Sequence, residues 1–140
     1  MEWYRKPDGE VVFGEIGARP PGARVTDLMN FNTDGDVYVG WADAVVHGRM
    51  PTLERRYNVG SITKRARGLG HITGVSGLDP LLEEYAADVV LVDLLPVGSP
   101  RRDWRATTIA DGIIIVRHPD LQRVIDMTEH FAADVQLHAQ

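Results

Sequence analysis

The sequence predicts an α+β fold in which an antiparallel-leaning sheet is flanked by helices. Three observations support this class: an N-terminal segment patterned as a β-hairpin, several further runs of strand-forming residues, and three stretches with apolar residues at helical spacing. The composition is 44% apolar and 25% charged over 140 residues. These values are typical of about one globular domain.

The first segment is expected to form the hairpin. Residues 1–6 make one short strand, and residues 10–16 follow with the strand-forming composition Glu-Val-Val-Phe-Gly-Glu-Ile. Between them, Pro7-Asp8-Gly9 is a strong turn sequence, because proline presets φ and glycine accepts a positive φ. The two prolines within residues 19–22 end the second strand, since proline cannot donate a hydrogen bond to a sheet.

Two helices are expected next. Residues 24–32 form a short one. The other begins near Asp34 or Asp36, either of which is a suitable N-cap, and Gly48 lies where a C-terminal cap belongs. Trp41 recurs at helical spacing with its apolar neighbours, so its side chain is expected in the core.

After Pro51 the sequence favours strands. The expected strands are residues 56–65, 71–75, 89–95, 112–117 and 135–138, the last of them at a sheet edge. A short helix opens at Asp79-Pro80, and the last helix begins at Pro119, because proline is favoured at a first helical position. The apolar face expected for the last helix comprises Leu121, Val124, Ile125, Thr128 and Phe131.

Two connections and one boundary complete the expected organisation. Gly68 and Gly70 lack the strand, the helix start and the downstream acid of a dinucleotide site, so they predict a hairpin turn. Arg101 and Arg102 are expected to be solvated within the loop 96–104. A division near residues 50–55 separates a first part, residues 1–53, from a second part, residues 54–140.

Charge and composition exclude several classes of function. A net charge of −5 argues against a nucleic-acid partner. The absence of cysteine excludes disulfides, thiolate catalysis and cysteine zinc sites. No apolar run approaches the roughly 18 residues that a membrane span requires, and the first residues lack the apolar segment of a signal peptide. We therefore expect a cytoplasmic protein with no membrane partner.

Two glutamates and an arginine are the candidate site residues. Glu2 and Glu15 lie on the two arms of the hairpin, directly opposite each other if the loop spans about four residues and diagonal in a looser register. Paired carboxylates repel unless a cation lies between them, and Mg²⁺ accepts oxygen ligands completed by water and phosphate. Arg19 lies four residues beyond Glu15 and could bind phosphate or carboxylate. The alternative is that all three are solvated surface residues.

The same residues resemble a known family. Glu2-Trp3-Tyr4, followed by residues 8–22 with the run Glu-Ile-Gly-Ala-Arg-Pro-Pro-Gly, resembles the end of the catalytic domain of ATP-grasp enzymes. The form of the run resembles carboxylate–amine ligases, including the L-amino-acid ligase type, and is more distantly similar to biotin carboxylase. In this superfamily, two acidic residues on neighbouring strands bind the magnesium ions of ATP.

The resemblance implies a function and roles for the site residues. ATP would phosphorylate a carboxylate to an acyl phosphate, which an amine then attacks. Glu2 and Glu15 match the two magnesium ligands, and Arg19 matches the arginine that contacts the phosphate or the acyl phosphate. Gly17 stands where many members have a metal-binding asparagine. Residues 1–53 then resemble the tail of the catalytic domain, and residues 54–140 resemble its C-terminal lobe.

The resemblance also implies that other parts are needed. An ATP-grasp site uses lysines on N-terminal sheets, whereas this chain holds only Lys6 and Lys64. We therefore expect a C-terminal fragment or split subunit that is inactive without an N-terminal ATP-grasp half. The alternative is a non-catalytic binding or oligomerisation module. In either case the faces around Phe13, Ile16 and Trp41 would lie exposed and favour a partner or self-association.

Overall fold

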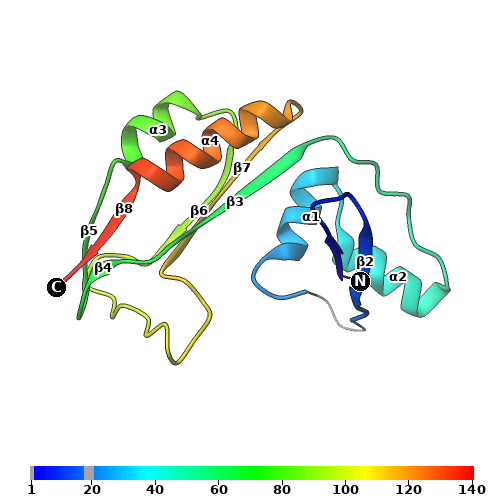
Figure 1. Ribbon diagram of the computed structural model, residues 1–140, viewed down its shortest axis with the longest axis horizontal. Coiled ribbons are helices and arrows are strands. Elements are labelled where there is room, and N and C mark those ends of the chain that lie inside the picture. Colours follow the sequence, from blue (N-terminus) through cyan, green and yellow to red (C-terminus); the bar gives the residue numbers. More distant parts are fainter. Residues whose placement is uncertain (1, 18–20) are drawn as a thin grey trace.

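The computed structural model describes residues 2–17 and 21–140 (Figure 1). The helices and strands follow one another as β1 (Glu2–Arg5), β2 (Val11–Glu15), α1 (Val25–Thr33), α2 (Val37–His47), β3 (Asn58–Lys64), β4 (Arg67–Gly68), β5 (Ile72–Ser76), α3 (Leu78–Glu84), β6 (Val89–Leu94), β7 (Gly112–His118), α4 (Leu121–Asp134) and β8 (Gln136–Ala139). The predicted α+β class with antiparallel-leaning sheets is confirmed. Within the described ranges, no helix is both long and apolar enough to cross a membrane.

The strands form three small sheets. Strands β1 and β2 make an antiparallel hairpin, and β7 lies between β3 and β6 in a fully antiparallel sheet. In the third sheet β8 lies between β4, to which it is parallel, and β5, to which it is antiparallel. The prediction that the C-terminal strand lies at an edge is therefore wrong, since β8 is paired on both sides.

Gly68, the last residue of β4, and Gly70 lie where the chain passes from β4 to β5 on the other side of β8. The prediction of a hairpin turn at these glycines is therefore also wrong. Strands β4 and β5 do not pair with each other, because β8 separates them. Gly68 has φ +99°, and a Cβ there would lie 1.8 Å from the carbonyl oxygen of Ala139. Only glycine permits this close approach and this conformation, which allows β4 to run beside the end of β8.

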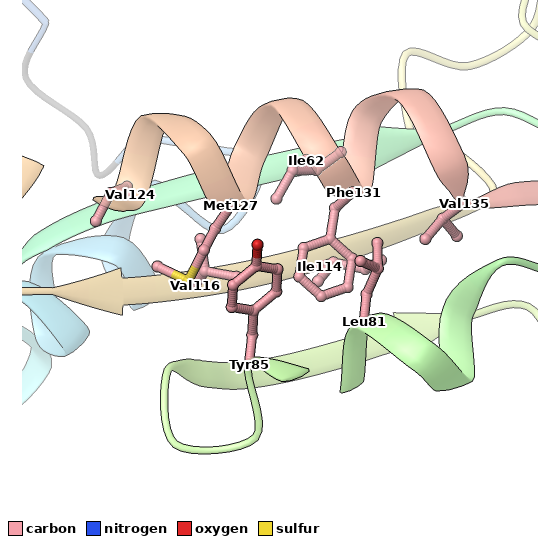
Figure 2. Packing of buried hydrophobic residues seen from close by; sticks show 9 residues of the cluster. All are labelled: Ile62, Leu81, Tyr85, Ile114, Val116, Val124, Met127, Phe131 and Val135. Atoms are coloured by element: carbon pink, nitrogen blue, oxygen red, sulfur yellow. The ribbon is translucent and has the colours of Figure 1, made fainter. Parts of the chain in front are cut away.

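The main core lies between α4 and the sheet β3-β7-β6, with α3 closing one side (Figure 2). Its buried residues are Ile62, Leu81, Tyr85, Ile114, Val116, Val124, Met127, Phe131 and Val135. At Gly60 on β3, an added Cβ would lie 2.3 Å from Thr128 Cγ2. The glycine therefore lets α4 approach the sheet closely.

Helix α4 differs from its prediction in where it begins and in which face it buries. It begins at Leu121, because the side chain of Asp120 accepts a hydrogen bond from the Gln122 amide at 2.8 Å and so caps the helix. Pro119 precedes the helix. Two residues of the predicted apolar face, Leu121 and Ile125, are 56% and 37% exposed. Met127, which was not part of the predicted face, is fully buried.

Helix α2 confirms its predicted ends but not its predicted burial. Asp36 accepts hydrogen bonds from the amides of Tyr38 and Val39, and Gly48 ends the helix with φ +66°. Trp41 is 49% exposed, so the core position expected from its spacing is wrong, whereas the exposure expected around Phe13, Ile16 and Trp41 is found. The helix is apolar on most of its surface, yet within it only Gly40 is buried. Its side chains therefore lack a covering surface in this chain.

Polar contacts join α1 to β7. Near the end of β7, the Arg117 guanidinium donates to the Asp34 carboxylate and, at 3.1 Å, to the Phe31 carbonyl oxygen. It also lies 4.2 Å from the centre of the Tyr57 ring. The Arg117 side chain is 26% exposed, so these interactions are only partly screened by solvent. They hold the C-terminal end of α1 against the sheet β3-β7-β6.

We expect Arg117→Met to loosen α1 without disturbing the core. A charge-assisted hydrogen bond contributes about 1.5–3 kcal/mol, so the amides of residues 25–33 should exchange with solvent about tenfold faster or more. Hydrogen exchange measured by NMR tests this expectation, with the amides of α4 as internal reference. Arg5→Met, which removes an exposed arginine from β1, is the matched control. Unchanged protection of α1 in Arg117→Met would contradict the role assigned to this contact.

Candidate functional site

The hairpin brings the two candidate glutamates into direct opposition. Glu2 pairs with Glu15 in the register of β1 and β2, with an irregularity between Glu2 and Trp3. Of the two registers that the sequence left open, the opposed one is the one found. Both side chains are exposed. Like charges placed directly opposite destabilise a strand pair, so this arrangement favours a bound cation.

The turn of the hairpin sets the register of the inner pairs, and a shift of one residue beyond Trp3 brings Glu15, in place of Gly14, opposite Glu2. The Lys6 amide donates to the Glu10 carbonyl oxygen at 2.8 Å, and the Gly9 amide donates to the Lys6 carbonyl oxygen at 2.9 Å. Gly9 has φ +89°, as the turn sequence requires, and Asp8 Oδ1 accepts the Glu10 amide at 3.0 Å. The loop is therefore tied at both ends, which aligns the two arms from the Arg5–Val11 pair to the Trp3–Phe13 pair.

Aromatic side chains lie on both faces of the hairpin. On one face the rings of Trp3 and Phe13 pack edge to face, with centroids 5.4 Å apart. On the other face Tyr4 covers Gly14, where an added Cβ would lie 2.5 Å from Tyr4 Cε2. Trp3, Phe13 and Tyr4 nevertheless remain 57%, 54% and 62% exposed. A two-stranded hairpin is marginal by itself, so these faces are suited to a covering surface.

The chemistry of the donors fits magnesium, with the coordination only partly supplied by this chain. Glu2 and Glu15 offer hard oxygen ligands, and Mg²⁺ is commonly held by one or two carboxylates together with water and substrate phosphates. Among the residues that the structure describes, no group of three or more histidine or acidic side chains is placed to hold a metal ion. The site therefore suits a metal that arrives with phosphate rather than an enclosed structural metal.

Arg19 lies outside the described residues, so its place relative to the glutamates stays a prediction. Gly17 is described and exposed, and a Cβ added there would meet no atom of the described residues within 4 Å. Packing against the described residues therefore does not require a glycine at this position, where the resemblance implies an asparagine.

A cavity of about 420 Å³ lies beside the start of α1. Its lining includes Arg24, Asp93, Arg102 and residues 108–113. Ala23 and Arg24 have φ of 53° and 62°, a left-handed conformation that non-glycine residues rarely adopt. Hydrogen bonds raise the pKa of Arg24, the larger effect coming from Asp27 and the smaller from Asp93. These bonds hold the strained residue against β6.

Asp111 is the buried residue that the sequence reasoning missed. Its carboxylate is fully buried and accepts the amides of Ala66 at 2.9 Å and of Arg102 at 2.8 Å. The Arg102 guanidinium donates to the Ala110 carbonyl oxygen, and the Arg101 guanidinium donates to that of Gly68. The prediction that both arginines are solvated is wrong, since they anchor the loop. No local sequence pattern marks Asp111, because its partners lie 9 and 45 residues away.

The comparisons with known proteins give a fold. No family model matches the chain, and no curated protein matches its sequence. Among solved structures, the chain is similar to the L-amino acid ligase from Bacillus licheniformis, with a TM-score of 0.74 and 14% identity. It is also similar to the N5-carboxyaminoimidazole ribonucleotide synthetase from Thermotoga maritima, with a TM-score of 0.69 and 12% identity.

The extent of the match is the same for both enzymes. Each similarity covers 99% of this chain but only 36% of the other protein, so the chain spans about a third of the length of these enzymes. The resemblance that the sequence suggested is thereby confirmed at the level of fold. The chain has the fold of the C-terminal portion of ATP-grasp ligases.

Proposed function

We propose that this chain is the C-terminal part of an ATP-grasp ligase that activates a carboxylate with Mg-ATP for attack by an amine. The observation that carries the proposal is the direct pairing of Glu2 with Glu15 in a chain with this fold. Residues 1–53 would be the tail of the catalytic domain, and residues 54–140 would be its C-terminal lobe. The absence of cysteine is consistent with a reducing compartment, and we propose the cytoplasm.

Each candidate residue has a role in this proposal. Glu2 and Glu15 would hold magnesium, and the bound ion would supply positive charge to neutralise the phosphate oxygens. Arg19 stabilises the charge that develops on the transferred phosphoryl group or on the acyl phosphate, as a guanidinium suits a planar, bidentate contact. The hairpin register positions the two carboxylates before any ligand arrives, which lowers the cost of assembling the site.

The partner proposed for this chain is an N-terminal ATP-grasp half, either on the same polypeptide or on a separate one. Support comes from large apolar side chains of the hairpin and α2 region that lie exposed. They are Trp3, Tyr4, Val11, Phe13, Ile16, Tyr38, Val39, Trp41, Val45, Val46 and Met50. Such a concentration of exposed apolar groups is typical of an interaction surface. The lysines and the adenine-reading segment of an ATP site would come from that half.

A second candidate function is a non-catalytic binding or oligomerisation module with the same fold. The exposed apolar surface of α2 favours it, because association requires no chemistry at Glu2 or Glu15. The two functions differ in what Glu15→Gln should change. The substitution removes a metal ligand but leaves the apolar surface intact, so only the ligase would lose its activity.

We expect a divalent cation to bind between Glu2 and Glu15 in the chain itself. Titration with Mn²⁺ should broaden the NMR signals at the start of β1 and the end of β2 selectively. Glu15→Gln should abolish this selectivity, because one of the two opposed charges is lost. Glu10→Gln is the matched control, since Glu10 lies on the same hairpin and pairs with Lys6 at 2.6 Å. Equal broadening in the wild type and Glu15→Gln would count against the metal site.

We expect the isolated chain to bind Mg-ATP only weakly. With the lysine-bearing sheets absent, too few phosphate contacts remain for a dissociation constant below about 1 mM. Isothermal titration calorimetry measures this directly. A dissociation constant in the micromolar range would show that the site is complete in this chain and would overturn the need for an N-terminal half.

We expect the isolated chain to self-associate through α2. Val45 and Val46 are 73% and 70% exposed, and burying such side chains contributes about 1.5–3 kcal/mol each. Sedimentation velocity over a concentration series should show species larger than a monomer, and Val45→Glu should shift them toward the monomer. Leu121→Glu, at a 56% exposed position on α4, is the matched control. A monomer at every concentration would contradict an exposed association surface.

A further inference from the structure

A second cavity lies on the C-terminal part of the chain, away from the hairpin. It has a volume of about 390 Å³ and is formed by the link between β4 and β5 together with the loop before β7. Its lining residues are Leu69, Gly70, Arg101, Arg102, Asp103, Trp104 and Arg105. The proposed ligase function uses none of these residues. Three of the seven are arginines, in a chain whose net charge is −5.

The charges of this cavity do not cancel. In the part of the chain that the structure describes, Arg101 alone among the three arginines lies within 4.0 Å of a carboxylate, that of Asp111. Asp111 is fully buried and also accepts two backbone amides, so its charge is directed into the protein. Asp103 accepts the Arg105 amide at 2.9 Å within the loop. The surplus of guanidinium groups gives the cavity a local positive potential.

The walls of the cavity are held in place by backbone contacts. The Arg101 amide donates to the Gly70 carbonyl oxygen at 2.9 Å, and the Arg101 guanidinium donates to the Gly68 carbonyl oxygen. The Arg102 guanidinium donates to the Ala110 carbonyl oxygen. Because these contacts already fix two of the arginines, little further ordering is needed when a ligand binds.

An exposed aromatic ring completes the lining. Trp104 is 60% exposed, and the Arg105 guanidinium carbon lies 5.3 Å from the centre of its ring. Leu69, on the other segment that forms the cavity, is 78% exposed. A large indole with so much free surface beside cations is suited to a planar or apolar ligand body, since stacking and cation–π interactions both operate there.

We propose that this cavity is a binding site for a small organic anion, a phosphate ester or carboxylate whose planar body lies against Trp104. Arg105 is exposed and binds the anionic group, and the anchored Arg101 and Arg102 supply the surrounding positive charge. The inference is independent of the magnesium site on the hairpin, because the two sites share no residue.

The test uses the 140-residue chain and two probes, phenyl phosphate and benzoate. NMR follows the indole N–H signals of the three tryptophans, and the variant Trp104→Leu serves to assign the signal of Trp104. We expect that signal to shift on addition of phenyl phosphate, with a dissociation constant below about 1 mM, while those of Trp3 and Trp41 stay unchanged. A stronger shift with benzoate would assign the site to carboxylates rather than phosphate esters.

Matched arginine variants separate a formed site from general attraction by charge. Arg105→Gln should weaken phenyl phosphate binding about tenfold, as expected for the loss of one charge-assisted contact. Arg49→Gln removes the same charge from an exposed position outside the cavity and should change the affinity less than about twofold. Equal weakening by both variants, or an unmoved Trp104 signal with both probes, would overturn the proposal.

Discussion

The burial of strand β7 under helix α4 is the interaction on which the other parts of the structure depend. Residues 114–116 have no exposed surface, and they hold β3 and β6 on either side. Both ends of the same strand then carry polar anchors. Asp111, just before the strand, fixes the loop that contains Arg102, and Arg117, near its end, fixes α1 through Asp34. A rigid central strand thus sets the position of segments that have little core of their own.

The candidate magnesium site differs from the segments that β7 anchors. The opposition of Glu2 and Glu15 is local, since it follows from a tied turn and from the one-residue shift in pairing between Glu2 and Trp3. Its surroundings are not local, because aromatic side chains cover neither face of the hairpin fully and α2 exposes most of its apolar surface. Residues 58–139 form a buried core, whereas the hairpin and α2 leave apolar faces exposed, and such a chain is suited to association. The chain is also similar to only about a third of the length of each of the two larger enzymes, which is consistent with this arrangement.

Local patterns predicted the local structure well. The hairpin turn at Pro7-Asp8-Gly9, the cap at Asp36 and the end of α2 at Gly48 all follow from the preferences of single residues and were confirmed. The errors concern partners far away in sequence. Trp41 has the spacing of a core residue but finds no covering surface, and the C-terminal strand, predicted at an edge, is paired on both sides. Burial and pairing depend on what the rest of the chain supplies, which periodicity does not report.

By itself the sequence determined the fold class, the hairpin and the two glutamates as candidates, because these rest on turn chemistry, periodicity and a spaced motif. The structure decided, through a local shift in the pairing between Glu2 and Trp3, that Glu2 lies opposite Glu15. It also decided that Asp111 is a buried anchor and that the arginines near Trp104 line a cavity. The physical reason is that the contacts of Asp111 with Ala66 and of Arg101 with Gly68 join segments 45 and 33 residues apart, and such contacts leave no periodic signal in the chain.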